Sequence, residues 1–269
     1  MADGKDTVLD YESARSYNRN VFLLNHGWTF AAYSQIDRNF YRLGYVLSQG
    51  RDRNRKSHVS FIPFFLLMRR QAMNAFWSLC SHQSFEAWVL LRPCLESALI
   101  VGKWTDDPGA SEVWKNRASD RDTYRREYSG KRLRSESLRH SDLIQSVLSR
   151  INDDFMHANT EYYRRHLDVR ERPDGETVEL NVHFFDAELD HETHLLAFLH
   201  LLMVVQNSLS ELLGALLVDQ QPVDVGYNSF REAYRGRYES FLKDHPEQAS
   251  VIQDLGLWPM IEGTSGTST

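Results

Sequence analysis

The chain has 269 residues, of which 42% are hydrophobic and 25% are charged, as is typical of soluble globular proteins. Its formal net charge of −6 excludes a protein that binds polyanions over its whole surface. Its two cysteines, Cys80 and Cys94, lie in apolar helical contexts, which excludes a disulfide framework and a paired-cysteine zinc motif.

The first half of the chain shows helical periodicity. Residues 11–47 carry apolar side chains at helical spacing, with an interruption near Asn25-His26-Gly27, which predicts two consecutive helices or one bent helix. A second helical region is predicted at 60–80, with Pro63 in its first turn, where the missing amide donor costs nothing. A third is predicted at 84–104, because its apolar residues keep a three-four spacing.

The second half of the chain is more varied. A polar, arginine-rich helix is predicted at 111–129 and a longer helix at 135–163. Alternating apolar and polar residues on both sides of a turn-forming segment predict a β-hairpin at about 167–184. Helix is predicted again at 187–218, where the apolar run indicates the central core helix, and at 229–243.

These elements predict a mostly α, single-domain helical bundle with one inserted β-hairpin. No long linker divides the chain, so one domain is expected over residues 1–258. Residues 259–269 are of low complexity and are predicted to form a disordered tail.

The sequence also leads to expectations about location and cofactors. The start of the chain has no basic segment followed by an apolar run, so no signal peptide is predicted. The longest apolar stretch, residues 195–205, has eleven residues and is too short to cross a bilayer. We therefore expect a cytoplasmic protein that does not contact a membrane. The chain has no phosphate-binding loop, nucleophile elbow or dinucleotide fingerprint, so we expect no cofactor.

Arg150 and His157 lie seven residues apart in the predicted 135–163 helix. Seven residues make about two helical turns, so both side chains should project from one stripe, with Cα atoms roughly 10.5 Å apart. A histidine can transfer a proton, and an arginine can stabilise charge on phosphate oxygens, which together suit metal-independent RNA cleavage. The side chains must then converge, or two copies must meet across a two-fold axis. The alternative is a surface pair, with Asp153 contacting His157.

A basic patch lies between Lys115 and Arg139. It holds nine basic and four acidic residues, a local net charge of +5, so the rest of the chain carries −11. Tyr124 and Tyr128 are interleaved with it and are candidates for stacking on bases. The predicted nucleic-acid-binding residues are Arg117, Arg121, Arg125, Arg126, Arg132 and Arg134. The alternative is a solvated helix with internal ion pairs, or a face for an acidic protein partner.

Two further polar groups lie on apolar helices. Arg92 and Glu96 are one turn apart, so they either fix helix packing as a neutralised pair or frame a pocket with His157. His191 and His194 are weak candidates for metal ligands, because their spacing specifies no third ligand. The alternative for them is a first helical turn in which acidic neighbours favour the helix dipole, so we predict no metal.

The arginine and histidine, six residues between them on a late helix, resemble the Arg-x(4–6)-His signature of HEPN domains. Leu91-Arg92-Pro93-Cys94-Leu95-Glu96, followed by Asp106-Asp107-Pro108, resembles the Leu-Arg-x-x-x-Glu…Asp-Pro segment of a family of uncharacterised bacterial helical proteins. In that family a helix with a polar residue and then a histidine precedes a short hairpin and a long apolar helix. The resemblance covers residues 60–218 and assigns the polar position to Asn152.

HEPN-like bundles often form homodimers, and many of them are ribonucleases or toxins. The resemblance therefore implies a homodimer that acts on RNA as a metal-independent endoribonuclease of defence or toxin type. It implies Arg150, Asn152 and His157 as catalytic residues. Ile151 departs from the family, because active members usually have a polar residue there. A second function also stays open, a non-catalytic interaction or scaffold protein in which Arg92, Glu96 and His157 organise the core.

Overall fold

A computed structural model describes residues 7–48, 58–156, 164, 166–171, 178–216 and 225–248. Most of these residues are helical, which confirms the predicted mostly α bundle with one hairpin. The helices are α1 (Thr7–Asn25), α2 (Gly27–Ser48), η2 (His58–Phe61), α3 (Ile62–Cys80), α4 (Ser84–Asp106), α5 (Ala110–Lys115), α6 (Arg121–Tyr128), η3 (Gly130–Leu133), α7 (Ser141–Arg150), η4 (Ile151–Met156), α9 (Glu188–Leu216) and α10 (Val225–Asp244). The predicted tail at 259–269 lies outside the described residues.

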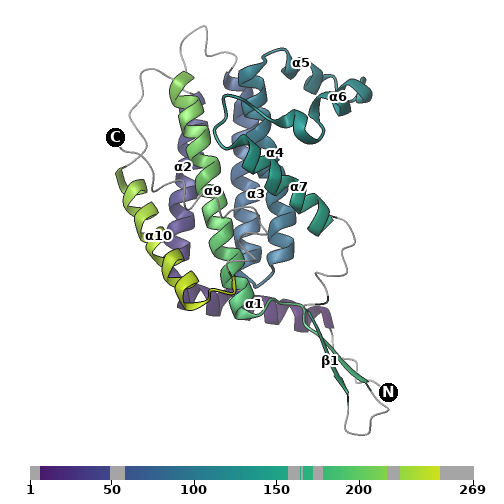
Figure 1. Cartoon of the computed structure of the whole chain (residues 1–269), viewed down its shortest axis with the longest axis vertical. Helices are drawn as coiled ribbons and strands as arrows, with labels where there is room; N and C mark the ends of the chain where they lie inside the picture. The colour runs from purple at the N-terminus through teal and green to yellow at the C-terminus, as the bar shows by residue number, and fades with distance from the viewer. Residues whose placement is uncertain are drawn as a thin grey trace.

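Helices α2, α3, α4 and α9 lie side by side and form the body of the bundle (Figure 1). Helix α1 crosses one end of this bundle, and α5 and α6 project from the opposite end. Helix α9 packs against α2, α3 and α4, and its residues 195–202 are buried except for His200. The prediction that the 187–218 helix is central is therefore confirmed.

The apolar part of helix α9 is longer than the predicted stretch at 195–205. Residues His191–Gly214 form a helical segment that is long and apolar enough to cross a membrane, by length and composition only. The prediction that the apolar stretch here is too short to cross a bilayer is therefore wrong. However, 78% of that apolar window is buried inside the bundle. A helix that is apolar on all sides is suited to the centre of a bundle. The absence of membrane contact stays a prediction.

The boundaries of α1, α2 and α3 follow from nearby residues. The predicted break near residue 26 is confirmed, because α1 ends at Asn25 and α2 begins at Gly27. Thr29 Oγ1 donates to the carbonyl oxygen of His26 at 2.6 Å, which stabilises the new turn. Pro63 lies in the first turn of α3, as predicted.

The polar segment after α4 forms shorter helices than predicted. The expected 111–129 helix is two helices, α5 and α6, because the Asp120 side chain accepts from the Thr123 amide at 3.0 Å and caps a new start. The expected 135–163 helix begins only at Ser141, after His140, whose φ of 60° is left-handed.

A second change affects the helix that follows. Its α-helical part ends at Arg150, and Ile151–Met156 continue as a π-helix. A π-helix bonds to the fifth residue instead of the fourth, so it turns by less per residue. The prediction of a regular α-helix between positions 150 and 157 is therefore wrong for residues 151–156.

The hairpin is confirmed. Strands β1 (Leu167–Glu171) and β2 (Val178–Val182) are antiparallel, with Val169 opposite Leu180, and they project from the bundle (Figure 1). Asp186 ties the returning strand to the corner between α3 and α4. Its Oδ2 accepts from the Ser84 amide at 2.7 Å, and its own amide donates to the His82 carbonyl oxygen at 2.9 Å.

Candidate functional site

Arg92 on α4 joins two of the predicted site residues. Its Nε donates to Asn152 Oδ1 at 2.7 Å, across 60 positions of sequence. Its Nη2 lies 3.4 Å from Glu96 Oε1, one turn further along α4. The Arg92 and Glu96 side chains are 31% and 32% exposed, so solvent reaches the pair. The structure thus brings together Arg92, Glu96 and Asn152, of which the sequence paired Arg92 with Glu96 by spacing and linked Asn152 only by resemblance.

Apolar contacts of η4 hold Asn152 against α4. Ile151 and Phe155 are buried on either side of it in sequence. The Phe155 ring lies 5.7 Å from that of Phe85 and 6.4 Å from that of Trp88, centroid to centroid. Because η4 is anchored in this way, the amide of Asn152 is fixed toward Arg92. Asn152 therefore orients the guanidinium group, which is a positioning role.

Tyr124 on α6 lies near the same pair. Burial, and then the negative charge of Glu96, raise the pKa of the Tyr124 phenol, while the charges of Arg117 and Arg92 oppose this shift. The side chain is half-buried and stacks on Tyr128, with ring centroids 5.1 Å apart and planes 20° apart. We call Arg92, Glu96, Tyr124 and Asn152 the α6–η4 site.

Tyr128 fixes α6 to the end of α4 and does not offer a ring to a ligand. It is buried, and its hydroxyl accepts from Trp104 Nε1 at 2.7 Å and donates to the Ala110 carbonyl oxygen at 2.6 Å. Burial raises the pKa of Tyr128 to about 12, so the phenol stays neutral near pH 7. The prediction that this tyrosine stacks on bases is therefore wrong, because its ring is inside the fold.

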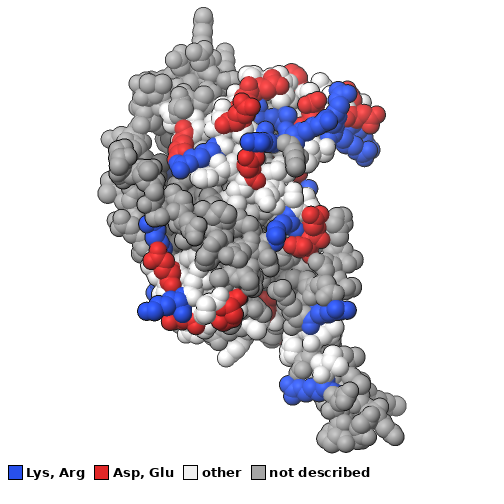
Figure 2. Space-filling view, in the orientation of Figure 1, with Lys and Arg blue, Asp and Glu red and all other residues white. Residues whose placement is uncertain are grey.

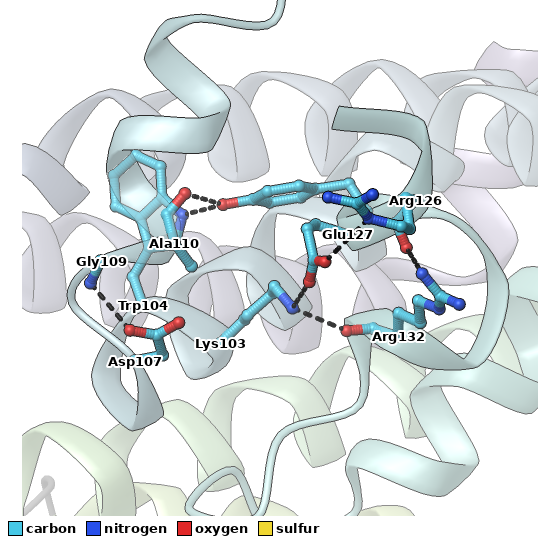
Figure 3. Close-up of polar contacts among 9 residues, drawn as sticks. Lys103, Trp104, Asp107, Gly109, Ala110, Arg126, Glu127 and Arg132 are labelled. Atoms are coloured by element: carbon cyan, nitrogen blue, oxygen red, sulfur yellow. Dashed lines mark hydrogen bonds and ion pairs between the residues drawn. The ribbon is translucent and has the colours of Figure 1, made fainter. Parts of the chain in front are cut away.

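Lys103 adds a second connection between the two helices. Figure 3 shows its ammonium group between Glu127 and the backbone of Arg132, at 4.0 Å from Glu127 Oε2 and 3.1 Å from the Arg132 carbonyl oxygen. The Arg132 guanidinium donates in turn to the Arg126 carbonyl oxygen. These contacts tie α6 and η3 to α4, so Tyr124 projects from a fixed support.

The arginines of the predicted basic patch are all exposed, and some of them pair with a described carboxylate while others do not. Arg134 pairs with Asp142 at 2.9 Å, and Arg126 lies 3.5 Å from Glu127. Figure 2 shows this mixture of basic and acidic side chains at the projecting α5–α6 end. These ion pairs support the alternative of a solvated surface for part of the patch.

The remaining arginines include two on α6 beside Tyr124. Arg121 and Arg125 are one turn apart on α6, and within the described ranges no carboxylate pairs with either. The Arg117 guanidinium lies 3.7 Å from the centre of the Trp114 ring and donates to the Trp114 carbonyl oxygen at 3.0 Å. Sequence reasoning missed this stacked pair, although a tryptophan three residues before an arginine in a helical segment was a readable signal.

Arg150 ends α7 and precedes the π-helical turn. It is half-buried, and no carboxylate in the described part of the chain pairs with it. His157 lies outside the described residues, so the predicted approach of the two side chains stays a prediction. Figure 2 shows the outline indented beneath the projecting α5–α6 end.

His191 and His194 serve the core. His191 Nε2 lies 2.6 Å from the Leu79 carbonyl oxygen, and its ring stacks on His82 with centroids 4.0 Å apart. Since a carbonyl only accepts, this nitrogen carries a hydrogen. Burial, followed by the nearby His82, lowers the pKa of His191 to about 3. His194 Nδ1 accepts from Trp88 Nε1 at 3.1 Å. Among the described residues, no group of three His, Cys, Asp or Glu side chains is placed to hold a metal.

Comparisons of the chain with known protein families, curated proteins and solved structures find no match. The likeness to HEPN domains stays a prediction from its motifs, and the functional conclusion depends on the geometry described above.

Proposed function

We propose that this protein is RNA-directed and binds a single RNA strand beside the α6–η4 site. The observation that carries the proposal is the joining of Arg92 to Asn152 near Tyr124, next to guanidinium groups that no described carboxylate neutralises. Guanidinium groups pair with phosphates and aromatic rings stack on bases, and this combination is common in proteins that bind single strands.

The binding roles follow from position. Arg121 and Arg125 lie on one side of α6 and would contact neighbouring phosphates. Tyr124 offers a half-buried ring whose back is supported by Tyr128. Arg117, flat on Trp114, extends this surface with a second planar cation.

The finer proposal is metal-independent cleavage of the bound strand. The ribose 2′-oxygen would attack phosphorus and the 5′-oxygen would leave, giving a 2′,3′-cyclic phosphate and a 5′-hydroxyl. His157 would take the 2′-hydroxyl proton or return one to the leaving oxygen, and Arg150 would stabilise the charge on the phosphate oxygens. Arg150 supports this assignment because it is half-buried and lacks a described carboxylate partner.

The alternative function is a non-catalytic interaction protein. One observation favours it: Arg92 already donates to Asn152 and Glu96, as an arginine that only organises helix packing would. In that case RNA would not bind, and substitution of Arg92 would change stability alone.

The binding proposal is tested by fluorescence anisotropy with a labelled twelve-nucleotide single-stranded RNA (about the length that such sites span). The variant Arg121→Ala/Arg125→Ala should bind at least about tenfold more weakly. The slope of log affinity against log salt concentration should become shallower by about 1.4, because each phosphate contact on a single strand contributes about 0.7 to that slope.

The matched control is Arg134→Ala/Arg139→Ala, which removes the same charge. Both arginines are already paired, with Asp142 at 2.9 Å and Glu211 at 2.8 Å. This variant should keep wild-type affinity. Equal losses in the two variants would reduce the effect to overall charge and contradict the proposed site.

The cleavage proposal is tested by degradation of the same RNA with a chelator present. The wild type should release a cyclic-phosphate product, while His157→Ala and Arg150→Ala should not. Activity that survives His157→Ala would remove the proposed catalytic residue. Activity that the chelator abolishes would contradict a metal-independent reaction. RNA binding without any cleavage would leave the coarser proposal standing and remove the finer one.

A further inference from the structure

An apolar surface lies along the seam between α2 and α3, away from the α6–η4 site. Its members recur at helical spacing on two stripes and are exposed or half-buried. They are Phe30, Tyr41 and Tyr45 on α2, and Leu66, Met73 and Trp77 on α3. We call this set the α2–α3 face. Contiguous exposed apolar side chains of this kind usually mark a contact surface.

Direct contacts make the two stripes one surface. Phe30 and Trp77 have ring centroids 6.4 Å apart at one end of the seam. Near its middle, Arg69 donates to both carboxylate oxygens of Asp37, at 2.7 and 2.8 Å. The same guanidinium lies 5.3 Å from the centre of the Tyr41 ring. The α2–α3 face is therefore continuous, and its one polar crossing is internally neutralised.

The charges around the α2–α3 face are basic. Asp37 is the one acidic residue in the sequences of α2 and α3, and Arg69 neutralises it. Arg38 and Arg70 are exposed around the apolar stripes. A two-fold contact with a second copy would place like charges against each other, which disfavours self-association. The fitting occupant is both apolar and acidic.

Aliphatic side chains indicate a polypeptide as the occupant. Leu66 is 61% exposed and Met73 is 39% exposed, and both offer a surface for packing against apolar side chains. A nucleic acid would use the aromatic rings and arginines but would leave these aliphatic groups without a complementary surface.

The sequence beyond Gln248 has this composition. Residues 249–262 contain Asp254 and Glu262 and no lysine or arginine. Their large apolar members are Val251, Ile252, Leu255, Leu257, Trp258, Met260 and Ile261. Positions 251, 255 and 258 share the spacing of one helical stripe.

The end of the described chain lies near the required place. Gln248 accepts from Thr193 Oγ1 at 3.0 Å, at the start of α9. His191, on the same turn of α9, contacts the Leu79 carbonyl oxygen, and Leu79 lies two residues after Trp77. Residues 249–262 extend over up to about 45–50 Å at 3.3–3.6 Å per residue. The Leu66–Trp77 stripe spans only about 16 Å.

We propose that residues 249–262 dock on the α2–α3 face of their own chain. Their apolar side chains cover the Leu66 and Met73 stripe, and the carboxylates of Asp254 and Glu262 face the surrounding arginines. This proposal does not depend on RNA binding.

Disulfide trapping in the full-length chain tests it. The face pair is Asn74→Cys with Gly256→Cys, because position 74 is exposed beside Met73 and position 256 carries no apolar anchor. The control pair is Leu24→Cys with Gly256→Cys, since Leu24 is 84% exposed on α1. Cys80 and Cys94 are buried and should not react. The face pair should form an intrachain disulfide at least about tenfold faster than the control pair.

A third variant adds Leu66→Asp to the face pair. It should slow trapping to the control rate, because a carboxylate among the apolar contacts opposes docking, while circular dichroism stays unchanged. Equal rates for the two pairs would overturn the proposal. A disulfide-linked dimer in place of the intrachain product would show that a second copy covers the face, and would overturn it as well. Protection of the thiol introduced by Asn74→Cys when single-stranded RNA is added would assign the face to nucleic acid and have the same result.

Discussion

Two polar clusters in this protein differ in their exposure to solvent. At the start of α9, His191 and His194 are buried, and each has a ring nitrogen bonded to a fixed partner. In the α6–η4 site, Arg92 and Glu96 are each about a third exposed, and the nearby Arg121 and Arg125 pair with no carboxylate among the described residues. Buried polar groups with partners hold a fold together, whereas half-exposed ones can exchange water for a ligand. Substitutions in the first cluster should therefore affect stability, and those in the second should affect binding.

Trp88→Ala should have the largest effect on the buried cluster. Trp88 is 1% exposed and donates to His194, so its loss leaves a cavity and an unpaired nitrogen. We expect the free energy of unfolding to fall by about 3–5 kcal/mol in urea denaturation. Phe184→Ala, which removes a 68% exposed ring, is the control and should change it by less than about 0.5 kcal/mol. Similar losses in both variants would break the distinction.

Gly102→Ala should affect both stability and the α6–η4 site. A Cβ at this position would lie 2.7 Å from Ser135 Oγ and 2.9 Å from Leu138 Cβ, closer than such atoms approach. The turn before α7 must shift, at a cost of about 1–3 kcal/mol in unfolding free energy. Because α7 leads into η4, RNA affinity should fall as well. In Gly214→Ala the added Cβ meets no atom within 4 Å, so this variant should lose neither stability nor RNA affinity.

The buried cluster should make stability depend on pH. Burial lowers the pKa of His191 to about 3, whereas the unfolded chain takes up the proton near pH 6.5. The unfolded state therefore binds more protons between these values, so stability is complete above about pH 6.5 and is lost as the pH falls toward 3. The slope should approach about 1.4 kcal/mol per pH unit.

His191→Gln should flatten that dependence, since its amide can donate to the Leu79 carbonyl oxygen without titrating. The control is His183→Gln, at an exposed position of the segment after β2. Urea denaturation at pH 7, 6 and 5 measures the slope. An unchanged slope in His191→Gln would assign the pH dependence to another group.

Asn152→Ala should have the smallest effect on stability. It removes one hydrogen bond from Arg92 at a half-exposed position, so the unfolding free energy should fall by about 1 kcal/mol. RNA affinity should nevertheless fall about tenfold, because the guanidinium loses its orientation. Asn152→Asp, which keeps the acceptor, should retain more binding than Asn152→Ala. A stability loss with unchanged affinity would favour the interaction-protein alternative.

The sequence predicted elements with strong periodicity and missed those set by single side chains. The apolar pattern of α9 and the alternation in the hairpin were sufficient, because each follows from burial of one face. The start of α6 depends on one cap by Asp120, and the late start of α7 follows a left-handed His140. Both features depend on a single residue, and apolar periodicity does not reveal them.

The candidate site was only partly predictable for a similar reason. Arg92 and Glu96 were paired correctly by their spacing, but the bond to Asn152 is a long-range contact. Tyr124 and Tyr128 have equivalent sequence contexts, yet only Tyr128 is sealed, by Trp104 and Ala110. Which arginines of the patch are neutralised depends on Asp142 and Glu211, which lie on other elements.

The contact of Asp186 with the α3–α4 corner has a consequence for the covalent continuity of the chain. It binds the amide of Ser84 and the carbonyl oxygen of His82 from beyond the hairpin, and α9 then packs among helices that precede the hairpin. The two parts of the polypeptide, up to Glu171 and from Val178 onward, are thus held by an extensive non-covalent interface. Produced as separate fragments, the two parts should associate and restore the fold.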